Sequence, residues 1–125
     1  MTVSGVTPQI RTTNLDESID FYVSKLGFEL AFKYADFYAG IKVGDQSIHL
    51  KFVDTKDPSI PFVADGDHLH LYFTTDDVDA EAKKLKRNGV VFRQEVADTA
   101  WGMRECWVVD NQGHVLCFGQ EIQTS

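Results

Sequence analysis

Two features of this chain could bind a ligand: a tryptophan in a polar loop, and polar side chains on strand-like segments. Trp101 precedes Gly102, so a large flat indole sits beside a flexible joint. The indole could cover the core or stack on a ligand, and both alternatives stay open. His49 and His70 lie in strand-like segments, and an imidazole can act as a general acid or base near neutral pH. No Asp or Glu that would position either imidazole can be named from the sequence.

Alternation predicts that these polar side chains share one face of a sheet. His49 alternates with Ile48 and Leu50, and Tyr72 alternates with Leu71 and Phe73. Successive side chains of a strand point to opposite faces, so the apolar set would face a helix and the polar set would face away from it. On this reasoning a concave polar face is lined by Gln9, Arg11, His49, His70, Tyr72 and Cys117. The alternative is that these side chains face water on an open sheet.

The order of the expected elements occurs twice. A helix capped by Asn14 follows a first strand at 6–13, and a helix capped by Asp76 or Asp77 follows a strand at 67–75. Three further strands follow each helix. The pattern predicts an α+β fold with two βαβββ repeats, a half-barrel-type mixed sheet and two helices outside. The expected organisation is a single domain, 1–125, with repeats at about 6–53 and 67–121 and a connecting loop at 54–66.

Composition excludes several partners. The net charge is −7, which disfavours binding to nucleic acid and favours a cationic small molecule. No apolar run is long enough to span a membrane, and the N-terminus lacks the pattern of a signal peptide, so a cytoplasmic location is expected. In that compartment Cys106 and Cys117 are expected to stay reduced.

Three stretches of the chain carry a resemblance to a known family. They are 14–22 with 25–28, His70 with 77–80, and 101–105 with 110–113. On these motifs the chain resembles the vicinal-oxygen-chelate superfamily, also called the glyoxalase/bleomycin-resistance/dioxygenase fold. Within it the chain is most similar to the bleomycin-resistance proteins, which are small dimers that sequester a drug.

The resemblance also locates the positions at which enzymes of the superfamily bind a metal. These positions match Thr7, His49, His70 and Cys117. Of the four, only His70 is a usual ligand in its usual place, and Cys117 replaces an expected glutamate. The expectation is therefore no metal and no cofactor. The alternative is a lyase, isomerase or dioxygenase that uses His49, His70 and Cys117 around zinc or iron.

The resemblance implies a different site in the drug-binding branch, with grooves at the interface of a homodimer. Trp101, beside Gly102, matches a loop aromatic that stacks on the ligand, and Phe32 and Phe37 match aromatics that wall the groove. Ordinary packing is the alternative for both phenylalanines. Ala31 stands where the best-matched relatives have an acidic residue, which leaves the ligand's identity open. The predicted function is non-catalytic binding of a cationic, aromatic antibiotic, with His49, His70 and Tyr72 completing the site. His114, in the last turn, is expected to be exposed.

Overall fold

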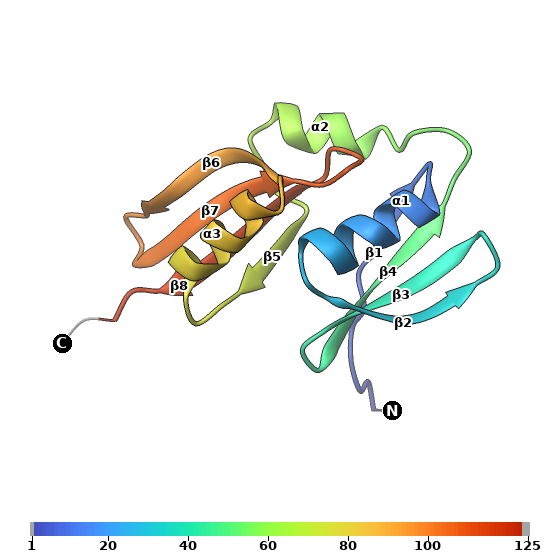
Figure 1. Cartoon of the computed structure of the whole chain (residues 1–125), viewed down its shortest axis with the longest axis horizontal. Coiled ribbons are helices and arrows are strands. Elements are labelled where there is room, and N and C mark those ends of the chain that lie inside the picture. The colour runs from blue at the N-terminus through green and yellow to red at the C-terminus, as the bar shows by residue number, and fades with distance from the viewer. Residues whose placement is uncertain (1, 124–125) are drawn as a thin grey trace. The chain divides into compact units, whose positions relative to one another are not determined.

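The computed structural model describes residues 2–123 and contains the predicted α+β architecture (Figure 1). The chain divides into two compact units, Met1–Asp57 and Pro58–Ser125. The boundary between them falls within the predicted connecting segment at 54–66. The first contains β1 (Gln9–Thr12), α1 (Leu15–Asp20), the π-helical turn η1 (Phe21–Lys25), β2 (Glu29–Tyr34), β3 (Tyr38–Val43) and β4 (Gln46–Phe52). The second contains α2 (Ser59–Asp65), β5 (Leu71–Thr74), α3 (Val78–Arg87), β6 (Val91–Asp98), β7 (Met103–Val109) and β8 (Val115–Glu121).

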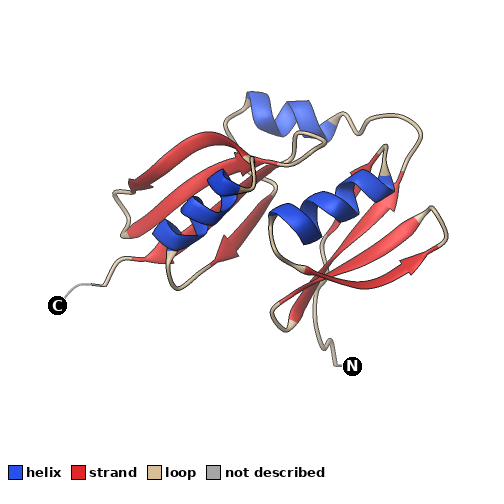
Figure 2. Cartoon of the chain, in the orientation of Figure 1, coloured by secondary structure: helices blue, strands red, loops and turns tan. Residues whose placement is uncertain are grey.

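Each unit holds one four-stranded mixed sheet, and the two sheets have the same topology (Figure 2). The strand orders are β1-β4-β3-β2 and β5-β8-β7-β6. The first pair in each order is parallel, and the other pairs are antiparallel. This identity of order and direction confirms the predicted βαβββ duplication.

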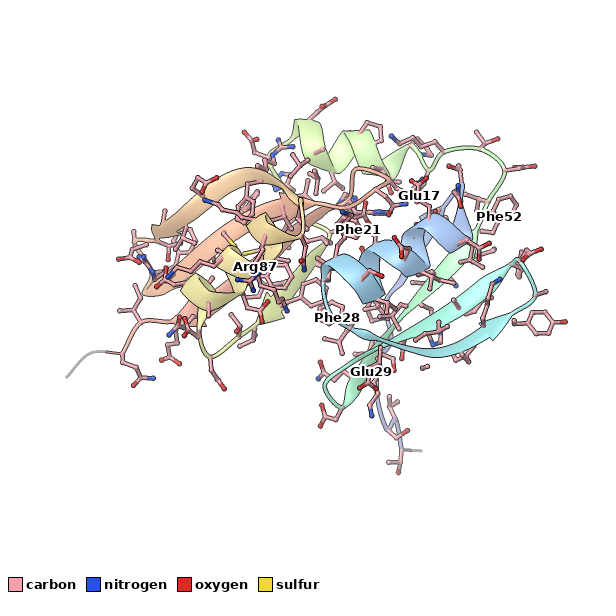
Figure 3. All side chains as sticks on the ribbon, in the orientation of Figure 1. Glu17, Phe21, Phe28, Glu29, Phe52 and Arg87 are labelled. Carbon is pink, nitrogen blue, oxygen red and sulfur yellow. The ribbon has the colours of Figure 1, made fainter. Side chains whose placement is uncertain are left out.

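The first helix begins where the sequence predicts. The Asn14 side chain accepts a hydrogen bond from the backbone N–H of Glu17 at 3.0 Å, which satisfies one of the free donors at the helix start. Thr12, at the end of β1, is buried and accepts a hydrogen bond from the Ser18 hydroxyl at 2.7 Å. The chain leaves the π-helical turn through Gly27, whose φ is 83°, and enters β2 at Glu29 (Figure 3).

The second helix is built in the same way. Asp77 is the cap, because its carboxylate accepts from the backbone N–H of Ala80 at 3.1 Å. Val78, Ala82 and Leu85 form its buried face, as their spacing predicts. Within residues 2–123, none of the helices combines the length and the apolar character needed to cross a membrane.

The segment predicted as a loop at 54–66 contains a helix, so that part of the prediction is wrong. Pro58 caps α2 and Pro61 lies in its first turn. A missing N–H does no harm there, because the first N–H groups of a helix have no partner within it. Ile60 anchors the helix with an exposed fraction of 2%. Two prolines close together are therefore compatible with a helix start as well as with a loop.

The prediction that His114 is exposed is also wrong. His114 is 2% exposed, and its Nδ1 lies 2.8 Å from Asp110 Oδ2. The other oxygen of Asp110 accepts from the backbone N–H groups of Gln112 and His114, both at 2.9 Å. The Asp110 carboxylate thus holds the tip of the β7–β8 hairpin from inside, and turn residues of this type need not face water.

We expect Asp110→Ala to lower the free energy of unfolding by about 2–4 kcal/mol, because it leaves buried donors of the hairpin tip without their acceptor. Urea unfolding followed by far-UV circular dichroism measures this. Asp76→Ala is the matched control, since Asp76 is exposed, and its effect should stay within about 0.5 kcal/mol. Equal effects of the two substitutions would contradict the role assigned to Asp110.

Candidate functional site

In the first unit, one face of the sheet is not covered by α1, and the strand register defines which side chains lie on it. Gln9, His49, Gly40 and Phe32 are successive partners across the four strands. The next row is made of Arg11, Lys51, Tyr38 and Tyr34. We call these two rows the first open face. It contains Phe32 and His49 of the predicted site, with Phe37 in the turn just before β3.

Hydrogen bonds link three strands across the first open face. Gln9 Nε2 donates to the Tyr38 hydroxyl at 3.1 Å, and the same hydroxyl lies 2.9 Å from His49 Nδ1. The tyrosine and imidazole rings also meet edge to face, with centroids 5.2 Å apart. Tyr38 was not among the predicted site residues, although its alternation with Ala39 and Ile41 would have placed it on this face. It orients His49, a role that a tyrosine hydroxyl fills here in place of a carboxylate.

The aromatic side chains of the first open face remain largely accessible. Phe32 is 44% exposed and Phe37 is 46% exposed. The Phe32 ring lies over Gly40, where a Cβ would overlap it, and stacks on Tyr38 with 6.3 Å between centroids. Lys51 Nζ lies 5.8 Å from the centroid of Phe37. The rings of Phe32 and Phe37 thus each lie against Tyr38, and Phe32 also meets His49 edge to face.

The second unit has a corresponding open face with different chemistry. Its rows are Tyr72, Cys117, Trp107 and Gln94, followed by Thr74, Gly119, Glu105 and Ala97. We call these rows the second open face. Tyr72 and Cys117, both named from the sequence, are direct partners in it. Glu105 and Trp107 were missed as site residues, although their spacing of two along one strand was a usable signal.

Glu105 is a buried carboxylate on the second open face, with an exposed fraction of 5%. The Tyr72 hydroxyl donates to Glu105 Oε2 at 2.9 Å. To reach it, the Tyr72 side chain crosses Gly119, where a Cβ would overlap the hydroxyl. Burial and the hydrogen bond to Glu105 raise the pKa of Tyr72, so the phenol keeps its proton and acts as the donor.

Trp101 and His70 lie at opposite ends of the second unit's hairpin. Trp101 precedes β7 and is 74% exposed, so it does not serve as a lid on the core. Gly102 has a φ of 89°, a conformation that favours glycine. His70 lies at the other end, near the β7–β8 turn, with its ring centroid 4.9 Å from that of His114.

A family model matches residues 5–118, and its description is Glyoxalase/Bleomycin resistance protein/Dioxygenase superfamily. The chain belongs to this superfamily. The resemblance inferred from the sequence is thereby confirmed, and so is the fold it implied. No curated protein sequence matches the chain.

Solved structures with the same fold cover nearly the whole chain. The antibiotic-binding protein TnmS3 from Streptomyces sp. CB03234 is 27% identical, covers 97% of this chain and 98% of its own, and has a TM-score of 0.76. The bleomycin-binding protein of Streptomyces verticillus, complexed with copper(II)-bleomycin, is 22% identical, with 99% of each chain covered and a TM-score of 0.70. A superfamily protein from Alicyclobacillus acidocaldarius is 22% identical, with 96% and 92% covered and a TM-score of 0.79.

The contacts of His70 and Cys117 bear on the superfamily's metal positions. His70 Nδ1 accepts from the backbone N–H of Val115 at 3.0 Å, so a neutral ring carries its proton on Nε2 and has no lone pair left for a metal. A ligating histidine instead donates its second ring N–H to an acceptor. Burial raises the pKa of the Cys117 thiol to about 12, with Glu105 adding to the effect. Thr7 lies before β1 and is exposed.

Thr7 and His70, as they lie and bond in the structure, do not fit the superfamily's metal positions. A ligating histidine needs a free ring nitrogen, and a threonine hydroxyl is not among the usual ligands of zinc. Within each unit, over residues 2–123, no three His, Cys, Asp or Glu side chains are grouped to hold an ion.

The two free thiols should be unreactive in the folded protein. Burial raises the pKa of Cys106 to about 11 and that of Cys117 to about 12, so at pH 8 both remain thiols, and both are fully buried. We expect Ellman's reagent to label neither residue at pH 8 until guanidinium is added, when both react. Ala100→Cys, at an exposed position, is the positive control and should react at once. Prompt labelling of Cys117 without denaturant would contradict its assignment as a buried thiol.

Proposed function

We propose that this protein binds a cationic, aromatic small molecule, of the bleomycin type or a related antibiotic, and sequesters it without chemical change. The observation that carries the proposal is the first open face, where the accessible rings of Phe32 and Phe37 lie beside the hydrogen-bonded Gln9–Tyr38–His49 chain. Aromatic pairs contribute about 0.5–1.5 kcal/mol each beyond the area they bury. Several exposed rings beside fixed polar groups are what a flat, polar-edged ligand requires.

Two further facts support a binding role. Structural neighbours include a bleomycin-binding protein and an antibiotic-binding protein. The net charge of −7 attracts a cationic ligand at long range, an effect that salt weakens.

We also propose that the protein acts without a metal, in the cytoplasm. The hydrogen bond that His70 accepts from Val115 supports the first point. Two free, buried thiols suit a reducing compartment. Metal analysis of protein purified without chelator tests the first point. A stoichiometric metal, or activity gained on adding zinc or iron, would favour the lyase or dioxygenase alternative instead.

Isothermal titration with bleomycin and related cationic antibiotics, at low salt and micromolar protein, tests the binding proposal. We expect binding that weakens as salt rises. Phe32→Ala and Trp101→Phe should each weaken it by roughly threefold to tenfold, because each removes or shrinks a stacking surface. Phe62→Ala is the matched control: Phe62 is 79% exposed on α2 and lies outside the proposed surface. The absence of binding by every antibiotic tested would rule the proposal out.

We propose that the protein is a homodimer, in line with the family resemblance. β2 and β6 are edge strands of their sheets and expose Leu30 (44%) and Val91 (64%). Exposed apolar side chains on an edge are usually covered by a partner or blunted by charge. Light scattering on micromolar protein should give a mass of twice 14.1 kDa, and Leu30→Asp with Val91→Asp should shift it toward one chain. A monomeric mass for the unmodified protein would contradict this.

A further inference from the structure

We propose that Glu105 and Tyr72 form a recognition site for a protonated amine or amidine on the second open face. This inference rests on the proposed binding function and names the cationic chemistry that the second unit recognises. Its starting point is a carboxylate that is 95% buried, as its exposed fraction of 5% implies, yet faces the side of the sheet that α3 does not cover.

The carboxylate of Glu105 has no cationic partner in the part of the chain that the structure describes. Arg104, its neighbour on β7, points to the helix side and pairs with Asp79 at 3.1 Å and Asp98 at 2.8 Å. No other ion pair within residues 2–123 includes Glu105. A buried charge is costly unless it is paired, so this position favours a cation that comes from outside the chain.

The groups that do contact Glu105 are neutral. Tyr72 donates its phenol O–H at 2.9 Å, and Glu105 contributes to the raised pKa of the Cys117 thiol. A cationic donor adds the attraction between opposite charges to the hydrogen bond, which a neutral phenol does not, and a buried charge gains most from such pairing. An ammonium or amidinium group that replaced the Tyr72 hydroxyl would therefore improve the carboxylate's pairing.

A ligand can displace the Tyr72 hydroxyl from Glu105 because the tyrosine is partly exposed and loosely enclosed. Its side chain is 40% exposed, and the position beneath it is Gly119, which has no side chain. Trp107 lies two residues from Glu105 on the same face of β7. An aromatic ring beside a carboxylate suits a compact or planar cation that carries N–H donors.

Benzamidine and benzamide are the probes, because they share a shape and differ in charge at pH 7. The reporter is the indole N–H resonance of Trp107, assigned with Trp101→Phe, which leaves Trp107 as the single tryptophan. We expect benzamidinium to shift this resonance with roughly tenfold tighter binding than benzamide.

Glu105→Gln should reduce that ratio to near one, since the amide keeps an acceptor for Tyr72 but loses the charge. Glu95→Gln is the matched control: it is the same substitution at an exposed site in the same unit, paired with Lys86, and the ratio should be unchanged. Gly119→Ala gives an opposite test. Its Cβ must displace the Tyr72 ring and free the carboxylate, so benzamidinium should bind several-fold more tightly.

Retention of the charge preference in Glu105→Gln would overturn the inference, as would weaker benzamidinium binding in Gly119→Ala. Circular dichroism and dispersed amide resonances establish that each variant is folded before it is compared. If benzamidinium does not shift Trp107 in the unmodified protein, the cation site is wrong. The antibiotic titration is independent of that result, because it depends on Phe32 and Trp101, so the two failures are distinguishable.

Discussion

Each four-stranded sheet of this protein packs one face against a helix, and the other face must satisfy its own polar groups. On the helix side, the register brings apolar residues together, such as Ile41 with Ile48 and Leu116 with Val108. On the open side, long side chains from the first strand of each order reach across the second strand to the third. Gln9 meets Tyr38 in this way, and Tyr72 meets Glu105. These cross-strand contacts fix the chemistry of both faces.

The duplication makes the two open faces directly comparable. Gln9 occupies the position of Tyr72, Tyr38 that of Glu105, and His49 that of Cys117, because the register of the two sheets is the same. In the first unit the long contact joins two neutral groups and leaves rings exposed. In the second it ends on a buried carboxylate. One scaffold thus presents a stacking surface in the first unit and an anionic group in the second.

The sequence predicted the parts of the fold that depend on local rules. The caps at Asn14 and Asp77, and the buried stripe of Val78, Ala82 and Leu85, follow from spacing alone. The prediction that His114 is exposed was wrong because its burial depends on the Asp110 carboxylate, which folds back beneath the turn. The prediction of a loop at 54–66 missed α2 because prolines occur at helix starts as well as in loops.

For the candidate site, alternation predicted which side chains share a face but not which of them bond. Glu105 was missed as a site residue, since its contact with Tyr72 depends on Gly119 giving that side chain room to cross. The hydrogen bonds of the second unit also decide which of its polar side chains can serve a ligand. His70 holds the hairpin tip through Val115 and lies against His114, so it is committed to the scaffold.

Tyr72, by contrast, holds Glu105 through a single hydrogen bond from a side chain that is 40% exposed. A neutral donor on a partly exposed side chain can be exchanged for a charged donor, whereas a backbone N–H is fixed in the hairpin. The buried Glu105 carboxylate therefore keeps the Tyr72 hydroxyl as its donor until a cation replaces it. Binding at this face is an exchange of donors rather than the filling of an empty pocket.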